Sequence, residues 1–232
     1  MIISHRHKYI FLKTRKTAST SLEIALSQSC GPDDIITPIT PSDEIIRKEL
    51  GYRGPQNYKI PIYKVPHYIK LYKATKGKRF RFYNHIQADL AKSLIGERIW
   101  NEYFKFTVER NPYDRAISRF YWSKRNKDDL PDINETILSW NSSKLSNWEI
   151  YTINNKIITD FIIKYESLEQ DLNKVQQILG LLPLNLPRAK GGHRKDKRHY
   201  SLVLSVECQK YIEKTCKNEI EQLGYFFETC DL

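Results

Sequence analysis

The sequence repeats one local pattern three times: a short apolar run typical of a strand, a polar turn, and then apolar residues at helical spacing. The strand-like runs, rich in β-branched and aromatic residues, cover residues 7–13, 103–110 and 159–166. Strands that alternate with helices favour a parallel sheet covered by those helices. The sequence therefore predicts an α/β fold with a central, mostly parallel sheet flanked by helices.

The predicted helices have recognisable ends. Asn111 and Pro112 supply an N-cap and a first-turn proline for the second helix. Apolar residues at helical spacing over 208–223 predict one long final helix that ends at Gly224. With 232 residues, of which 40% are hydrophobic, the chain can close one core, so we expect a single domain over 1–232. Its proline-rich segment 30–80 breaks the pattern and predicts a variable insertion that shapes a site.

Basic residues outnumber acidic ones by 38 to 27, which gives a net charge of +11, and the surplus is clustered. Residues 47–81 hold eleven Lys and Arg against one acidic residue, and residues 188–198 hold six against one. Residues 203–232 are acidic, which argues against a uniform basic coat that serves solubility alone; each basic cluster is either a solvated face or a site for an anionic ligand. We expect a cytoplasmic protein without a membrane span, because no long apolar run or signal-peptide pattern occurs.

Lys16 lies among hydroxyl residues in the turn TRKTASTS, residues 14–21, between the first predicted strand and its helix. Backbone N–H groups at a helix N-terminus, the helix dipole and Ser or Thr hydroxyls together bind oxyanions. No glycine occurs in residues 1–30, so the Walker loop of nucleotide kinases is absent. The alternative is that these Ser and Thr residues merely cap the helix.

Arg110 ends the second strand, and Ser118 lies eight residues further on in the following helix. Because the carboxyl ends of parallel strands meet at one edge of a sheet, both residues can line the same crevice as the 14–21 turn.

Several segments resemble the sulfotransferases that use 3′-phosphoadenosine-5′-phosphosulfate (PAPS), in particular the carbohydrate branch related to the heparan and chondroitin enzymes. RKTASTSLE is similar to their phosphosulfate loop and RNPYDRAISRFYW to their 3′-phosphate motif, while NHIQADL, DFIIKYESLEQDL and HRKDKRHYS match further segments of the family in order. The resemblance covers nearly the whole chain apart from residues 30–80. It implies a P-loop-NTPase-like three-layer fold and PAPS as co-substrate, with no metal. The family loop usually reads close to PKTAGTS, so Arg15 replaces a proline and Ser19 a glycine.

The resemblance also implies roles for single residues. Lys16 would stabilise the leaving phosphate, and His85 would be the base, with Asn84 or Asp89 as orienting partners. The expected cofactor-binding residues are Arg15, Lys16, Thr17, Ser19, Thr20 and Ser21 for the phosphosulfate, Arg110 and Ser118 for the 3′-phosphate, and Arg194, Lys195 or Lys197 from a basic loop.

The acceptor expected from the resemblance is a hydroxyl of a saccharide. The stretch from Arg47 to Arg81, with its interleaved aromatics Tyr58, Tyr63, Tyr68, Tyr72, Phe80 and Phe82, would suit a sulfated or carboxylated sugar chain. Three alternatives stay open: an ATP- and magnesium-dependent phosphotransferase, a basic nucleic-acid-binding module, and a sugar-binding protein that has lost catalysis. No RRM, KH or zinc-finger signature supports nucleic-acid binding, and Arg110 stands where a magnesium-binding Asp would be expected.

Overall fold

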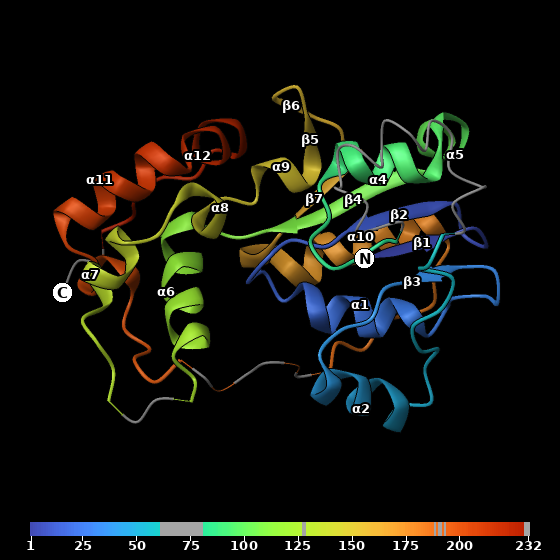
Figure 1. Cartoon of the computed structure of the whole chain (residues 1–232), viewed down its shortest axis with the longest axis horizontal. Coiled ribbons are helices and arrows are strands. Elements are labelled where there is room, and N and C mark those ends of the chain that lie inside the picture. Colours follow the sequence, from blue (N-terminus) through green and yellow to red (C-terminus); the bar gives the residue numbers. More distant parts are fainter. Residues whose placement is uncertain (61–80, 127–128, 188, 190–191, 193, 230–232) are drawn as a thin grey trace. The chain divides into compact units, whose positions relative to one another are not determined.

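The computed structural model describes residues 1–60, 81–126, 129–187, 189, 192 and 194–229 (Figure 1). The chain folds into two compact units, each made of two separate segments. Unit 1 contains Met1–Val108 and Glu149–Ala189, and unit 2 contains Glu109–Trp148 and Lys190–Leu232.

The sheet of unit 1 has the strand order β3-β1-β2-β4-β7. Its strands are β1 (Ile2–Ser4), β2 (Tyr9–Leu12), β3 (Ile35–Ile36), β4 (Phe104–Glu109) and β7 (Phe161–Lys164). β2 pairs with β4 in parallel, with Leu12 opposite Thr107, whereas β1 is antiparallel to both β2 and β3. β2, β3 and β4 therefore share one direction, and the predicted α/β fold with a mostly parallel central sheet and flanking helices is confirmed. The sequence pattern did not predict β1.

Helices cover both faces of this sheet, and α1 and α4 lie on opposite sides of it in Figure 1. Phe11 and Phe106 of the sheet, Leu22 of α1 and Val175 of α10 belong to one buried cluster, so α1 and α10 share a face. The helical elements are α1 (Ser19–Ser27), α2 (Pro41–Glu49), α4 (Ala88–Ile95), α5 (Glu97–Glu102), α9 (Trp148–Tyr151), η2 (Tyr165–Ser167) and α10 (Leu168–Leu179).

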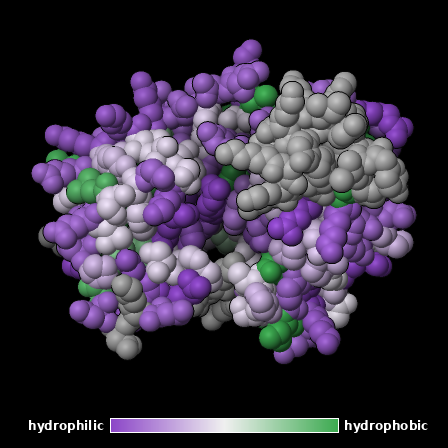
Figure 2. Space-filling model, viewed as in Figure 1, coloured by the Kyte–Doolittle hydropathy of each residue, from purple (hydrophilic) through white to green (hydrophobic). Residues whose placement is uncertain are grey.

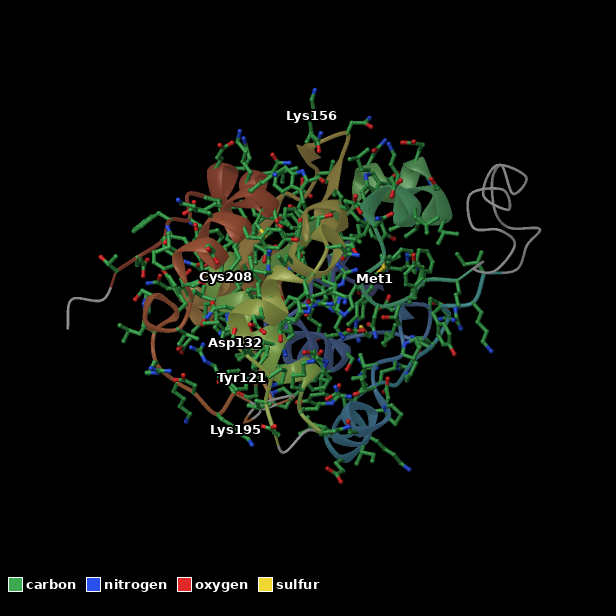
Figure 3. All side chains as sticks on the ribbon, turned by 60° about the vertical axis from the view of Figure 1, so that its left-hand side comes forward. Met1, Tyr121, Asp132, Lys156, Lys195 and Cys208 are labelled. Carbon is green, nitrogen blue, oxygen red and sulfur yellow. The ribbon has the colours of Figure 1, made fainter. Side chains whose placement is uncertain are left out.

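A small hairpin of β5 (Thr152–Ile153) and β6 (Lys156–Ile157) turns at Asn154 and Asn155. Both asparagines have positive φ, 51° and 60°, which is the backbone that a tight two-residue hairpin requires. Lys156 projects from this hairpin in Figure 3.

Unit 2 is helical around α6, whose N-cap Asn111 accepts a hydrogen bond from the backbone N–H of Tyr113 at 3.0 Å. Its elements are α6 (Pro112–Ser123), α7 (Ile133–Leu138), α8 (Ser142–Leu145), η3 (Tyr200–Leu202), α11 (Val206–Thr215) and α12 (Lys217–Leu223). The prediction of one final helix over 208–223 is wrong, because the backbone leaves the helical region at Cys216, with φ −108° and ψ 25°. Cys208, Ile212 and Cys216 are nevertheless buried in one core cluster, as their spacing predicted.

Hydrophilic residues cover much of the coloured surface in Figure 2. No helix among the described residues combines the length and apolar character needed to cross a bilayer.

Candidate functional site

The loop between β2 and α1 has an unusual backbone. Lys16 and Ala18 adopt left-handed conformations, with φ of 62° and 58°, although neither is a glycine. This conformation costs a non-glycine residue about 1–2 kcal/mol, and such strain is concentrated at functional sites. A left-handed residue next to right-handed ones turns successive N–H groups toward one concave side, which binds anions.

The first turn of α1 opens directly onto this loop. Its N-cap is Ala18, and no side chain caps the helix, so the Ser and Thr residues of the loop are not mere capping residues. The first N–H groups of a helix have no partner within the helix. They supply donors for an anion beside Lys16, which is half-buried.

Two of the loop hydroxyls hold the loop together. Ser19 Oγ donates to the carbonyl of Thr14 at 2.5 Å. Thr14 Oγ1 donates to the carbonyl of Val108, so the 2.8 Å contact between Thr17 Oγ1 and Thr14 Oγ1 takes its proton from Thr17. The hydroxyl protons of Thr17 and Ser19 therefore bind protein oxygens, which leaves their backbone N–H groups as the groups to offer an anion.

The other two hydroxyls of this turn differ from each other. Ser21 Oγ accepts a hydrogen bond from the backbone N–H of Ala189 at 3.3 Å. The hydroxyl of Thr20 makes no hydrogen bond with any residue that the structure describes. Thr20 is thus the hydroxyl of this loop with the most freedom to bind a ligand.

A buried ion-pair network anchors the loop to α1. Lys13 Nζ lies 2.6 Å from Glu23 Oε2, and Arg47 Nη2 lies 3.7 Å from Glu23 Oε1. Burial acts to raise the pKa of Glu23, but the positive charges of Lys13, the Met1 amino group and Arg47 outweigh it and lower this pKa to about 2. Glu23 therefore stays ionised and holds the end of β2 against α1.

Part of the predicted acceptor surface is wrong, because two of its residues are buried. Arg47 and Phe82 are buried, so neither can meet a sugar chain. Tyr63, Tyr68, Tyr72 and Phe80 of the same prediction lie outside the described residues.

His85 lies beside the loop and also has a positive φ, 59°. Its Nδ1 lies 3.0 Å from the carbonyl oxygen of Lys13. Since a carbonyl only accepts, Nδ1 carries the proton and Nε2 keeps its lone pair. Burial first, and then the charge of Lys13, lower the pKa of His85 to about 3. His85 is therefore a neutral imidazole with Nε2 available to take a proton.

Neither expected orienting side chain is hydrogen-bonded to the His85 ring. Asn84 Nδ2 donates to the carbonyl of Pro38 at 2.6 Å, and Asp89 Oδ1 accepts from the backbone N–H of Leu90. The Lys13 carbonyl orients the ring instead. No side-chain pattern could have identified this partner, because any residue type presents the same backbone oxygen.

Unit 2 holds the second group of predicted residues. Arg110 follows β4, and its Nε donates to Asp114 Oδ2 at 2.7 Å. Ser118 lies one helical turn beyond Asp114 on the same side of α6. Its half-exposed hydroxyl makes no hydrogen bond with the described residues.

Arg194 holds the predicted basic loop together through hydrogen bonds to its backbone carbonyls. Its Nε donates to the carbonyl of Asp196 at 2.6 Å, and its Nη2 to that of Arg198 at 2.5 Å. Lys195 and Lys197 are exposed, and Lys195 is labelled in the lower part of Figure 3. The two lysines of this loop are thus presented outward by a turn that Arg194 organises.

A buried cluster that the sequence analysis missed supports the start of α6. Arg115 forms ion pairs with Glu109 and, at 3.2 Å, with Glu219 Oε1, and all three side chains are buried. Asn147 Nδ2 donates to Glu109 Oε1 at 3.2 Å. Burial raises the pKa of Glu109 despite the opposing charge of Arg115. No signal in the sequence marked this burial, because Arg119 precedes the buried pair Phe120 and Tyr121 in the same way and is not buried.

The structure thus brings the predicted residues together in two groups. The first, in unit 1, consists of Arg15, Lys16, Thr17, Ser19, Thr20, Ser21 and His85; the second, in unit 2, consists of Arg110, Ser118, Arg194, Lys195 and Lys197. Among the residues described, no group of three His, Cys, Asp or Glu side chains is placed to hold a metal ion.

Comparison with known proteins gives three similarities. The sequence model of the Sulfotransferase family matches residues 1–226. An uncharacterized protein of Archaeoglobus fulgidus is 35% identical over 97 residues, which cover 40% of this chain and 80% of that protein. The crystal structure of a sulfotransferase from Alicyclobacillus acidocaldarius aligns with a TM-score of 0.41 and 14% identity over 94% of this chain and 96% of that one.

Proposed function

The chain belongs to the sulfotransferase family, and we propose that it transfers a sulfuryl group from PAPS to a hydroxyl of a carbohydrate acceptor. The observation that carries the proposal is the loop at residues 14–21. Its left-handed Lys16 and Ala18 and its uncapped helix start offer N–H groups to an anion. His85 is hydrogen-bonded to the residue that opens this loop.

The proposed reaction is an in-line displacement at sulfur. The acceptor oxygen forms the new bond to sulfur as the bond from sulfur to the 5′-phosphate oxygen breaks, so negative charge grows on that phosphate. Lys16 and the N–H groups of the loop stabilise this charge. His85 Nε2 takes the proton of the acceptor hydroxyl.

The charges around His85 suggest how the base becomes effective. In the absence of a ligand, burial and the cations Lys13 and Arg15 hold its pKa down. An anionic phosphosulfate on the loop offsets these cations and raises the pKa of His85. Donor binding would thus strengthen the base at the stage at which a proton must be accepted.

The residues of unit 2 are proposed to bind the rest of the donor. Arg110 and Ser118 bind the 3′-phosphate, for which a guanidinium fork suits two phosphate oxygens at once. Lys195 and Lys197 add positive charge from the exposed part of the basic loop, and Arg194 takes part by organising that loop.

An anionic saccharide is the first acceptor to test. Arg47 and Phe82 are buried, but Lys48, Lys59 and Arg81 from the same stretch are exposed. Their charge would attract a sulfated or carboxylated sugar chain more than a neutral one.

Calorimetry with adenosine 3′,5′-bisphosphate is the direct test of the donor. We expect micromolar binding, with ATP binding much more weakly. Absence of binding at tens of micromolar, together with binding of ATP, would refute the proposal in favour of a phosphotransferase. Incubation with radiolabelled donor and a panel of sulfated, carboxylated and neutral oligosaccharides then identifies the acceptor, and the His85→Asn variant should bind the bisphosphate without transferring sulfate.

A further inference from the structure

Asp114 joins two arginines that come from distant parts of the chain. Its Oδ2 accepts from Arg110 Nε at 2.7 Å, and its Oδ1 accepts from Arg194 Nη1 at 2.5 Å. Each carboxylate oxygen thus holds one guanidinium. The side chains are mostly buried, with exposed fractions of 12% for Arg110 and 22% for both Asp114 and Arg194.

The charge of Asp114 opposes phosphate binding, although its position suits the helix. It lies in the first turn of α6, where the helix dipole favours an anion, whether carboxylate or phosphate. A carboxylate there repels a phosphate that approaches the same arginines, and it reduces their combined charge from +2 to +1. A site shaped by charge alone would place a neutral residue at this position.

The geometry offers a different reason for the carboxylate. Arginine side chains have many rotamers, and fixing two of them during ligand binding costs conformational entropy. Asp114 fixes both guanidinium groups beforehand. Because the other nitrogens of Arg194 bind the carbonyls of Asp196 and Arg198, the same contact also ties the basic loop to α6.

We propose that Asp114 is a positioning residue that holds Arg110 and Arg194 side by side as one binding surface for the 3′-phosphate of the donor. This inference rests on the proposed function and adds a residue to it. It also assigns Arg194, one of three candidates in the basic loop, to the 3′-phosphate.

Whether Asp114→Asn strengthens or weakens binding of the nucleotide distinguishes a positioning role from a simple effect of charge. The variant removes a negative charge from the neighbourhood of a phosphate, so charge alone predicts tighter binding. Asn keeps only one acceptor oxygen, so one arginine loses its hydrogen bond and the other loses its ion pair. Losing this fixation predicts binding of adenosine 3′,5′-bisphosphate that is about tenfold weaker. Binding of adenosine 5′-monophosphate, which lacks the 3′-phosphate, should change by less than about twofold.

The experiment is calorimetry of the full chain with both nucleotides, for the wild type, Asp114→Asn, Arg194→Lys and the double variant. Arg194→Lys keeps the charge but loses the fork, so it should lower the preference for the 3′-phosphate as much as Asp114→Asn does. The double variant should be no worse than either single one, because each breaks the same arrangement. Glu221→Gln removes a carboxylate from an exposed pair with Lys217 in the same unit, and it should behave as the wild type.

Three outcomes would overturn the inference. Tighter or unchanged binding of the bisphosphate by a folded Asp114→Asn variant would make charge the dominant effect. Equal weakening for both nucleotides would reduce Asp114 to a general structural role. If Asp114→Asn does not fold, an unchanged preference of Arg194→Lys for the nucleotide with the 3′-phosphate would overturn the inference. Failure of the wild-type chain to bind the bisphosphate would instead refute the proposed function itself.

Discussion

Lowering the pH should destabilise this protein through His85 in a measurable way. The folded ring has a pKa of about 3, against an ordinary value of 6.5 in the unfolded chain. Above pH 6.5 both states hold a neutral ring, so stability does not depend on this group. Below pH 6.5 the ring becomes protonated in the unfolded state but stays neutral in the folded state. The free energy of unfolding therefore falls until the pH reaches the folded pKa.

The size of the effect follows from the pKa difference. Each pKa unit corresponds to about 1.36 kcal/mol, so between about pH 7.5 and about pH 5 the wild type should lose about 2 kcal/mol through His85. The matched variant is His85→Asn, whose side-chain amide can donate to the Lys13 carbonyl but does not titrate.

Urea unfolding of both proteins at the two pH values is the assay. We expect the wild type to lose about 2 kcal/mol more than the variant, a difference that cancels the contributions of all other groups. NMR should also find no titration of the His85 ring in this range without ligand. Equal losses in the two proteins would refute the burial and charge argument for a neutral base.

Three further changes test the loop and the start of α6. Lys16→Ala should lower turnover at least about a hundredfold while nucleotide affinity changes by about tenfold or less, as steady-state kinetics and calorimetry can measure, because the charge it stabilises grows during transfer; an equal loss in both quantities would contradict this role. Ala18→Gly should raise the free energy of unfolding by about 0.5 kcal/mol, since glycine adopts the left-handed backbone without steric cost but loses more entropy on folding; denaturant unfolding checks it, and a loss of stability would mean that the Ala18 methyl group is needed. Arg115→Leu should cost about 3 kcal/mol in the same assay, because it leaves Glu109 and Glu219 buried without a cation; a change below about 1 kcal/mol would contradict the importance of this cluster.

The pattern of strands and helices in the sequence predicted most of the fold. Asn111 and Pro112 begin α6 as predicted, and Gly224 follows the last helix in a left-handed conformation. The break at Cys216 escaped prediction because the apolar spacing continues through it, and periodicity does not register a change of backbone angle at one residue. The strand β1 escaped because its residues Ile2–Ser4 are too few to establish an alternating pattern.

For the candidate site, the sequence predicted the residue types but not the contacts between distant residues. The residue types at 14–21 predicted an anion-binding loop, but they could not show that the hydroxyls of Thr17 and Ser19 donate to protein oxygens within it. The bond from His85 to the Lys13 carbonyl joins residues 72 positions apart, and a backbone oxygen has no sequence signature. Asp114 lay within a recognised motif, yet its role depends on Arg194, 80 positions away.

The discontinuous make-up of unit 1 also constrains how the protein is synthesised. Phe11 and Leu22 need Ile163 and Val175 to complete their core, and these residues emerge only after the first segment of unit 2. From Val108 to Ala189 a ribosome adds 81 residues, which takes about 4–16 s at typical rates of translation. During that interval the apolar faces of α1 and β4 lack the residues of the second segment that pack against them in the folded protein. Chaperone demand should therefore be greatest for nascent chains that end between these two residues, and a chain cut after Val108 should aggregate rather than fold.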